Sequence, residues 1–438
     1  MRLIILLAVS ANILLSAQEA ATQKSAEGGL VHSKQKGRYE VLEQLPQKAE
    51  SFDTSFDYAR PFGTFRTANI TTQHDALTEQ NIEAERKGAT AFGGIFGFET
   101  ASLHGLRLHV GAYVSQKIAS LTASNQNDAL FNAKGDSYTY IGEASVAYEN
   151  DTVQAKVGRI RLDTPYADSD DIRMSPNSFE GASLHAQLSD AWQTDAYVLT
   201  RWAGTDSEQI DLYTELVDGG YGLAGGAVTY SIDEENEVSL WYYNVDRESD
   251  IIYAEVAADM RFNEDFHMEW GLQGAHIMER SDSDIEGDVL GAMLIADLGY
   301  VYGGLSCNYV FEDANNTITD GFGGGPYYTS LDEQTIGSIS ALAPGHDLFV
   351  YRLALGLNFS GLGAKDLSVE FVHGHFLVED SPVDAQENDL ALTYGITKRW
   401  YFESIYTKVS LDNIEFSAGD PEVTFDFQRL VTRLDYKF

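Results

Sequence analysis

The last nine residues of the chain, LVTRLDYKF (430–438), alternate strictly between two sets of side chains. One set is Leu430, Thr432, Leu434, Tyr436 and Phe438, and the other is Val431, Arg433, Asp435 and Lys437. Successive side chains of a β-strand point to opposite faces, so this period of two predicts a strand. One face of that strand is rich in aliphatic and aromatic groups, and the other carries charge.

The same period recurs along most of the chain. It defines eighteen candidate strands of roughly ten residues: 63–72, 89–100, 105–117, 137–149, 152–162, 179–189, 193–203, 221–231, 236–246, 250–261, 264–278, 288–299, 301–312, 347–359, 366–377, 387–397, 399–410 and 424–438. Gly and charged residues gather on one face, as Arg352 does, while Leu353 and Leu355 lie on the other. We therefore predict an all-β fold, an eighteen-stranded transmembrane antiparallel β-barrel with a wet lumen.

Closure of such a barrel gives every backbone N–H and C=O a hydrogen-bond partner, which the hydrocarbon of a lipid bilayer cannot provide. An aromatic residue at the end of an alternating strand looks like the signal that outer-membrane barrel proteins present to the barrel-assembly machinery. We assign that role to Tyr436 and Phe438. The alternative is an ordinary C-terminal strand of a soluble β-protein.

The N-terminal region precedes this pattern. Residues 1–17 have the features of a secretory signal peptide, because Arg2 is followed by an apolar run and then by the small residues Ser16 and Ala17. Residues 18–62 are polar with little pattern and are interpreted as a periplasmic lead-in. Residues 63–438 form the predicted barrel.

The composition narrows the possible partners. With 29 Lys and Arg against 67 Asp and Glu, the formal net charge is −38, so nucleic acid is excluded as a partner. The single cysteine, Cys307, cannot form an internal disulfide. No cofactor motif is present, and no nucleophile motif of a hydrolase occurs, so an enzyme is not expected.

The predicted connections alternate between short and long. Barrels of this kind have short periplasmic turns and long external loops, which also places both termini in the periplasm. Two long connections, 163–178 and 313–346, are the candidate inward loops. If the first connection is fully extended, it can run about 25 Å into the lumen and the same distance back. That is enough to reach the axis of a barrel roughly 36 Å across.

The first inward loop lies in the stretch GRIRLDTPYADSDDIRMSPNSFEG (158–181), which is dense in charge. Opposed acidic and basic groups in a narrow opening select what passes. The candidate constriction residues are Arg159, Arg161, Asp163, Asp168, Asp170, Asp171, Arg173 and Arg201. The aspartates could face the arginines Arg159, Arg161 and Arg201 across the opening, or they could brace the loop against the wall through Arg173. Further candidates for the lumen wall are Glu143, Glu269, Arg352, Glu370 and Arg433.

Four segments resemble one known family. KVGRIRLDTPYADSDDIRMSPNSFEGA (156–182) is similar to the segment that leads into, forms and leaves the third external loop of OprD-type outer-membrane porins. YVLTRWAG (197–204), GGPYYTSLDEQTIG (324–337) and FETASLHGLRLHVGAY (98–113) resemble further segments of that family. The resemblance implies an eighteen-stranded barrel whose pore works within one chain and passes small solutes by diffusion. The family includes channels for basic amino acids and others for small carboxylates.

These observations predict a passive diffusion channel in the outer membrane of a Gram-negative bacterium. The excess of acidic residues favours cations or zwitterions among small hydrophilic solutes, if these residues line the lumen. Alternatively, the acidic residues lie on external loops, next to the lipopolysaccharide of the membrane. The alternative is an adhesin-like, surface-binding barrel whose loops close the lumen. Both a monomer and a trimer are compatible with the sequence. A metal site is not expected, because His373 and His375 lack a third ligand and Asp168 to Asp171 lack the spacing of a calcium loop.

Overall fold

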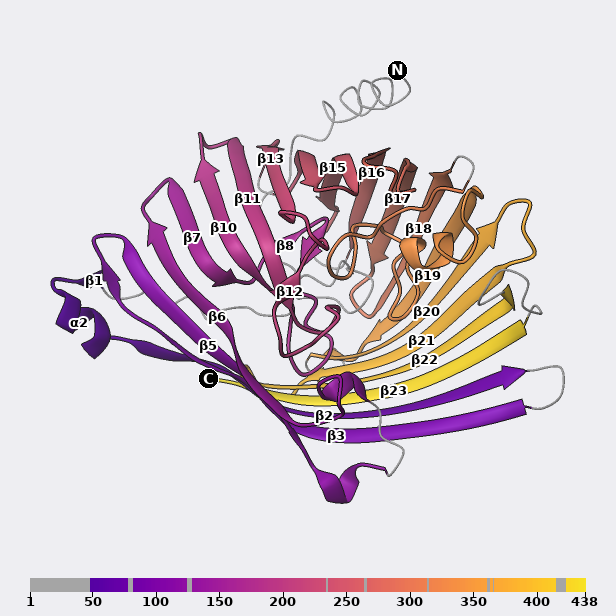
Figure 1. Cartoon of the computed structure of the whole chain (residues 1–438), viewed down its shortest axis with the longest axis horizontal. Helices are drawn as coiled ribbons and strands as arrows, with labels where there is room; N and C mark the ends of the chain where they lie inside the picture. The colour runs from indigo at the N-terminus through magenta and orange to yellow at the C-terminus, as the bar shows by residue number, and fades with distance from the viewer. Residues whose placement is uncertain are drawn as a thin grey trace.

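A computed structural model describes residues 48–77, 82–123, 128–233, 235–263, 266–312, 315–360, 363–364, 366–414 and 423–438. Within these ranges the chain forms a closed antiparallel barrel of eighteen long strands (Figure 1). The strands are β2 (Arg60–Leu77), β3 (Ile82–Glu99), β5 (Leu106–Lys117), β6 (Tyr138–Glu149), β7 (Val153–Ile160), β10 (Ser178–Gln187), β11 (Trp192–Ala203), β13 (Leu223–Ser231), β14 (Glu237–Val245), β15 (Ser249–Arg261), β16 (His267–Glu279), β17 (Gly287–Asp297), β18 (Val301–Phe311), β19 (Leu348–Asn358), β20 (Leu367–Val378), β21 (Asp384–Gly395), β22 (Trp400–Ile414) and β23 (Val423–Lys437). The predicted fold is confirmed.

The barrel closes where the last strand meets the first. β23 pairs antiparallel with β2, so that Tyr436 lies opposite Phe65 and Asp435 lies opposite Arg66. Phe438 packs its ring on that of Phe65 at 5.3 Å between centroids and on that of Phe96 at 6.3 Å. The alternating C-terminal segment is therefore the seam of the barrel.

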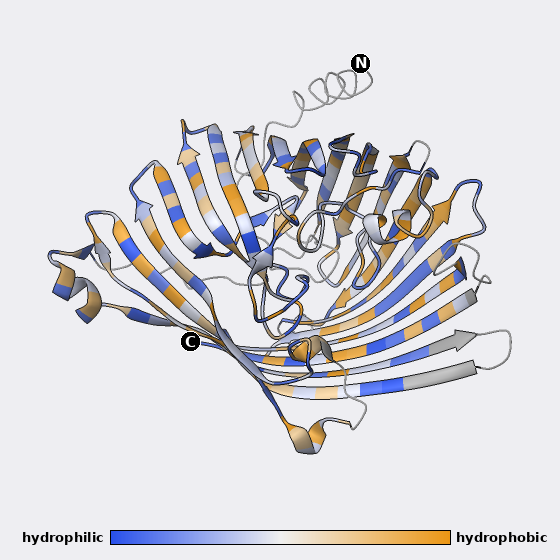
Figure 2. Cartoon of the chain, in the orientation of Figure 1, coloured by the Kyte–Doolittle hydropathy of each residue, from blue (hydrophilic) through white to orange (hydrophobic). Residues whose placement is uncertain are grey.

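The two faces of the strands differ as the period of two requires. On β19, Leu353, Leu355 and Leu357 are 46%, 59% and 45% exposed on the outer face, whereas Arg352 is 4% exposed on the inner face. Blue and orange bands alternate along many of the strands in Figure 2. The outer face is thus the one that can lie against lipid, and the inner face carries the charge.

The N-terminal end of the described chain is irregular. A two-residue strand, β1 (Lys48–Ala49), pairs with β4 (Ser102–Leu103), and a short helix, α2 (Phe52–Asp57), precedes β2. The first barrel strand begins three residues before the predicted boundary at residue 63, because Arg60 already pairs with Glu99. The predicted signal peptide (1–17), and the lead-in up to residue 47, lie outside the described residues. No helix of the described ranges is long and apolar enough to cross a membrane.

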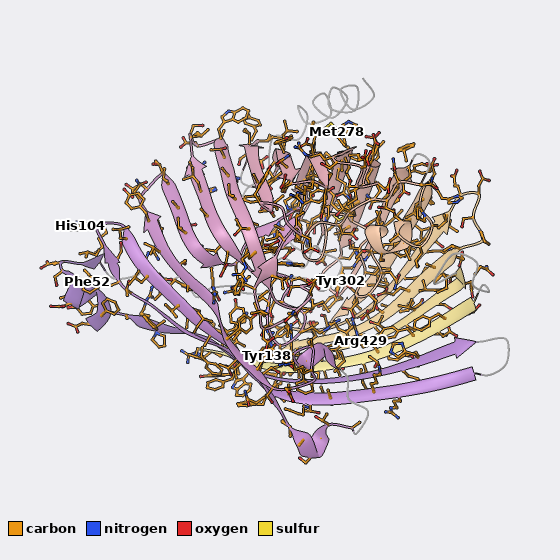
Figure 3. The ribbon with its side chains drawn as sticks, viewed as in Figure 1. Phe52, His104, Tyr138, Met278, Tyr302 and Arg429 are labelled. Atoms are coloured by element: carbon orange, nitrogen blue, oxygen red, sulfur yellow. The ribbon has the colours of Figure 1, made fainter. Side chains whose placement is uncertain are left out.

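Two connections fold into the barrel. The first, residues 161–177, is called loop A, and the second, residues 315–347, is called loop B. Loop A contains a small hairpin of β8 (Asp163–Thr164) and β9 (Ala167–Asp168), and loop B contains a short helix, α3 (Ile336–Ser340). Figure 1 shows both within the ring of strands, and in Figure 3 the side chain of Arg429 points into the same space. Loops A and B overlap the two connections, 163–178 and 313–346, that the sequence analysis expects to fold inward.

The terminal aromatic residue gives a test of the proposed assembly signal. Phe438→Ala removes two ring contacts at the seam, worth about 1–3 kcal/mol together. We expect severalfold less folded barrel in outer membranes, measured by heat-modifiable migration on gels. Leu430→Ala, a change on the same strand that keeps the terminal aromatic, is the control and should match the parent. Equal yields of the two variants would contradict the assembly role.

Candidate pore constriction

Loops A and B meet inside the lumen. The amide of Asp168 donates to the carbonyl of Phe322 at 2.9 Å, and the amide of Phe322 donates to the carbonyl of Tyr166 at 3.0 Å. The Tyr166 hydroxyl lies 2.9 Å from that of Tyr327. Tyr166 also packs on Tyr243 of β14 at 5.1 Å between ring centroids. The tip of loop A is thus fixed both to loop B and to one wall of the barrel.

The other end of loop A is fixed to the opposite wall by a buried ion network. Arg66 of β2 donates to Asp171 of loop A at 2.6 Å and to Asp435 of β23 at 2.8 Å, and all three side chains are at most 5% exposed. Arg66 also donates to the carbonyl of Arg173, and Arg433 donates to the carbonyl of Asp171, each at 2.6 Å. Asp171 therefore braces the loop, one of the two roles left open by the sequence.

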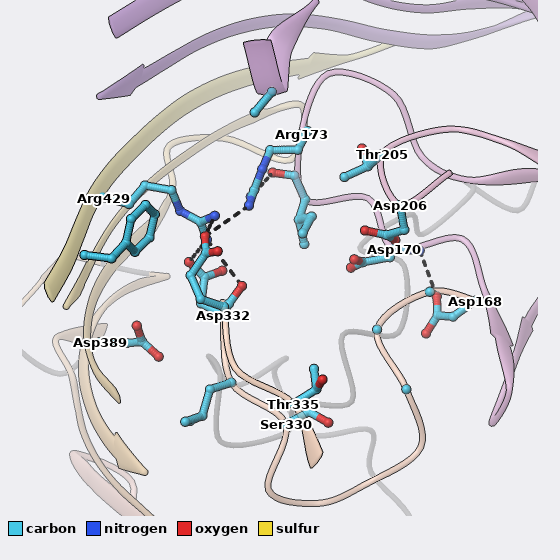
Figure 4. Close-up of a pocket in the computed structure, with 18 of the residues that line it drawn as sticks. Asp168, Asp170, Arg173, Thr205, Asp206, Ser330, Asp332, Thr335, Asp389 and Arg429 are labelled. Carbon is cyan, nitrogen blue, oxygen red and sulfur yellow. Dashed lines mark hydrogen bonds and ion pairs between the residues drawn. The ribbon is translucent and has the colours of Figure 1, made fainter. Parts of the chain in front are cut away.

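A cavity of about 460 Å³ remains between the two loops and the wall. Its lining comes from loops A and B, from the connections 118–137 and 204–222, and from β2, β19, β21 and β23. The charged residues among the lining are Asp168, Asp170, Arg173, Asp206, Asp332, Glu333, Arg352, Asp389 and Arg429. In Figure 4, Asp168, Asp170 and Asp206 lie on one side, and Arg173 and Arg429 lie on the other, with Asp332 beside Arg429. Such an arrangement sets up a transverse field.

The acidic side consists of carboxyl groups held close together. The Asp170 amide donates to the Asp168 carboxylate at 2.8 Å, and Asp170 takes a left-handed conformation with φ of 32°. Burial, reinforced by Asp163, raises the pKa of Asp168 to about 7. Burial, reinforced by Asp206 and Asp168, raises the pKa of Asp170 well above its usual range. Burial also raises the pKa of Asp206, although Asn177 donates to its carboxylate at 2.6 Å.

The basic side is partly neutralised by the tip of loop B. Arg429 of β23 forms ion pairs with both Asp332 and Glu333, and Arg173 lies 3.6 Å from Glu333. Burial opposes ionisation of Asp332, but Arg429 and Arg173 outweigh it and hold its pKa below the usual range. The Asp332 carboxylate beside Arg429 therefore stays ionised at neutral pH.

The tip of loop B is also held by backbone amides. Glu333 and Gln334 donate their amides to the two oxygens of Glu387 on β21 at 2.9 and 2.8 Å. The hydroxyl of Thr407 on β22 donates to Asp332 at 2.9 Å. Both loops thus span the lumen and are tied to strands on each side, so the cavity has fixed walls.

Three predicted constriction residues lie elsewhere. Arg159 and Arg201 pair with Glu180 of β10 at 3.0 and 3.2 Å, and Arg161 pairs with Glu143 of β6 at 3.2 Å. The prediction that these arginines face the aspartates of loop A is wrong, because closer carboxylates on neighbouring strands take them. Asp163 is exposed and accepts from the amide of Ser169 at 3.2 Å, so it stabilises the hairpin.

The predicted wall residues lie on the inner face of their strands. Arg352 and Glu370 are 4% and 2% exposed, and Glu143 is held by His109 at 2.8 Å and Tyr113 at 3.0 Å. Arg433 pairs with Glu403 of β22 at 3.3 Å. Glu269 is half-buried at the end of the barrel that carries the short turn to β15.

The sequence predictions do not include several residues that line the cavity or hold its loops. Arg429 shares a strand face with Arg433, four residues away, so strand periodicity alone could have found it. Arg66 could have been found from the same pattern on β2. Asp206 and Asp332 lie in connections without periodicity, and no sequence signal distinguishes them from other loop aspartates.

The barrel with a cavity enclosed by two inward loops defines a class of protein, the outer-membrane channels. The family model described as "outer membrane porin, OprD family" matches residues 88–313. The chain belongs to this family. It is an outer-membrane porin, and its lumen carries a channel for small solutes.

Solved structures show the same fold at low identity. OccK9 (OpdG) of Pseudomonas aeruginosa superposes with a TM-score of 0.70 at 14% identity, covering 86% of this chain and 98% of that one. OpdK of the same species gives 0.69 at 16% identity, covering 86% and 99%. Acinetobacter baumannii OccAB4 gives 0.64 at 16% identity, covering 86% and 98%. No curated protein sequence matches the chain.

The buried network at Arg66 predicts a loop that is costly to detach. Arg66→Ala leaves Asp171 and Asp435 buried without their shared guanidinium group. Such a loss should lower the free energy of unfolding by about 3–5 kcal/mol. We expect a lower midpoint of urea unfolding and noisier single-channel currents. Arg159→Ala, which breaks a half-exposed pair with Glu180, should cost at most about 1 kcal/mol. Quiet, parent-like currents from Arg66→Ala would contradict the bracing role.

The raised pKa values on the acidic side predict a pH-dependent selectivity. Below a pH of about 7 the Asp168 carboxyl is protonated and neutral, and above it the group is charged. The preference for cations should therefore rise as the pH increases from 5 to 8.5, measured as reversal potential under a KCl gradient. Asp168→Asn should flatten this rise by lowering the value at high pH. An unchanged pH profile in Asp168→Asn would show that the dependence comes from other carboxyl groups.

Proposed function

We propose that this porin is a passive diffusion channel for small hydrophilic solutes that prefers cations and zwitterions. One observation carries the proposal. Across the cavity, the aspartates Asp168, Asp170 and Asp206 face Arg173 and Arg429 (Figure 4). A solute with an amine at one end and a carboxylate at the other finds an opposite charge on each side.

The balance of charge supports the preference for positive groups. Of the three guanidinium groups that line the cavity, Arg429 is already paired with Asp332 and Glu333, and Arg173 lies beside Glu333. The opposite carboxyl groups have no ion pair of that kind within hydrogen-bond distance in the described part of the chain. When they ionise, the acidic side therefore has the larger uncompensated charge.

A relative gives a point of contrast. The structure of OpdK from Pseudomonas aeruginosa was determined with vanillate, an aromatic carboxylate. In this chain a carboxylate would meet Arg173 and Arg429 only in competition with Asp332 and Glu333. We therefore propose that simple anions are disfavoured here. Contacts of the outer face with lipid and lipopolysaccharide, and of the last strand with the assembly machinery, complete the proposal.

Charge substitutions on the two sides should shift selectivity in opposite directions. Arg173→Gln should raise the permeability ratio of K⁺ to Cl⁻ severalfold at pH 8, and Asp206→Asn should lower it, measured in planar bilayers. Arg201→Gln, which removes an equal charge outside the cavity lining, is the control. Liposome swelling with lysine, glycine and acetate then ranks the solutes directly. Anion selectivity of the parent would overturn the proposed preference, and negligible conductance would favour a closed, surface-binding barrel.

A further inference from the structure

A second cluster of charged groups lies far along the wall from the constriction, where β15, β16 and β17 meet the short turn that joins β15 to β16. In the register of these strands Asp259 lies opposite Glu269, and His267 lies opposite Asp297. His267 and Glu269 are two residues apart and share a strand face. Short turns lie at the periplasmic end of such barrels, so the cluster is at the inner mouth of the channel.

The face that carries this cluster is the inner one. Gln273, on the same face of β16, lies 3.0 Å from the Tyr253 hydroxyl and is 4% exposed. Gly271, between Gln273 and Glu269 on that face, lies under the ring of Tyr328 from loop B. On the intervening positions, Trp270 pairs with Leu294, which is 46% exposed on the outside. The cluster therefore lies on the lumen side of the wall.

The geometry is that of converging metal ligands. One ligand atom from each of Asp259, His267 and Glu269 lies within 4.8 Å of the other two, and this is the one such group of three in the described ranges. The Asp297 carboxylate lies 3.9 Å from His267 Nε2. Among the described residues, no hydrogen-bond partner meets His267 Nε2 or Asp259 Oδ1, although both atoms are buried. The described structure thus leaves one imidazole nitrogen and one carboxylate oxygen of the cluster buried without a hydrogen-bond partner.

The charge of the cluster favours a cation. Three carboxylates around one imidazole repel one another unless a positive charge lies between them. Arg261, opposite His267 in the register, brings a single positive charge. A divalent ion would supply two positive charges. After small side-chain rotations, the nitrogen and the carboxylate oxygens could each lie at about 2.0–2.2 Å from it. Imidazole with carboxylates suits first-row transition ions, whereas Ca²⁺ and Mg²⁺ prefer oxygen ligands alone.

We propose that Asp259, His267 and Glu269, with Asp297 as a fourth ligand, form a binding site for one divalent transition-metal ion at the periplasmic mouth of the pore. The ligands come from three strands. Spacing along the sequence therefore gives no hint of them, and only the barrel register brings them together.

The test uses the full-length barrel, purified in detergent and titrated with Zn²⁺ by isothermal calorimetry. The parent should bind one Zn²⁺ saturably. The variants His267→Gln, Asp259→Asn and Glu269→Gln should each bind at least about 10-fold more weakly. His276→Gln is the matched control, because His276 lies on the same strand and contacts one carboxylate, Asp288, at 2.8 Å. It should keep the parent affinity.

Two further measurements make the result decisive. Heat-modifiable migration and the β-sheet signal in circular dichroism show that each variant is folded. Co²⁺ in place of Zn²⁺ gives visible absorption that should change in His267→Gln and stay unchanged in His276→Gln. The site is overturned if the folded parent shows no saturable binding, which would mean that Arg261 neutralises the cluster. It is equally overturned if His267→Gln binds with the parent affinity, which would place the ion at another histidine.

Discussion

Closure of the sheet between β2 and β23 is the constraint on which the rest of the structure depends. Hydrocarbon offers no hydrogen-bond partner, so each strand in the membrane must find a neighbour on both sides. The eighteen strands meet this demand only because the last one pairs with the first, from Thr64 opposite Lys437 to Ala76 opposite Phe425. Closure also fixes an inner face that lipid never touches, and there charged side chains can be buried in pairs.

The seam also organises the channel. Arg66 on β2 lies opposite Asp435 on β23, and the same guanidinium group holds Asp171 of loop A. Two further arginines lie on the inner face of β23. Arg429 binds loop B, and Arg433 donates to the carbonyl of Asp171 in loop A. The strand pair that closes the barrel thus also anchors both inward loops on one side of the lumen. A buried arginine with two carboxylate partners is costly to break, so the loops keep fixed positions in the lumen.

The same inner wall carries two charge arrangements with different chemistry. At the constriction, loops place aspartates and arginines on opposite sides of a cavity of about 460 Å³, and burial raises the pKa of each of these aspartates above its usual range. At the periplasmic mouth, strand register alone places a histidine among carboxylates. The first arrangement suits transient contact with a passing solute that carries both charges. The second suits a bound ion, because its ligand atoms converge.

The sequence by itself determined the strands and their faces, because a period of two is local and each strand carries its own. It therefore predicted the eighteen strands, and it assigned Arg352, Glu370 and Arg433 to the polar face of theirs. It could not decide which charges meet. Asp171 was indistinguishable from Asp170 in the sequence, yet Asp171 braces the wall and Asp170 lines the cavity. In one of the two arrangements left open by the sequence, Arg159, Arg161 and Arg201 lie opposite the aspartates, but they pair with Glu180 and Glu143 instead. Those pairings join residues distant in sequence, and only the closed barrel, with its register and its inward loops, sets the distances between them.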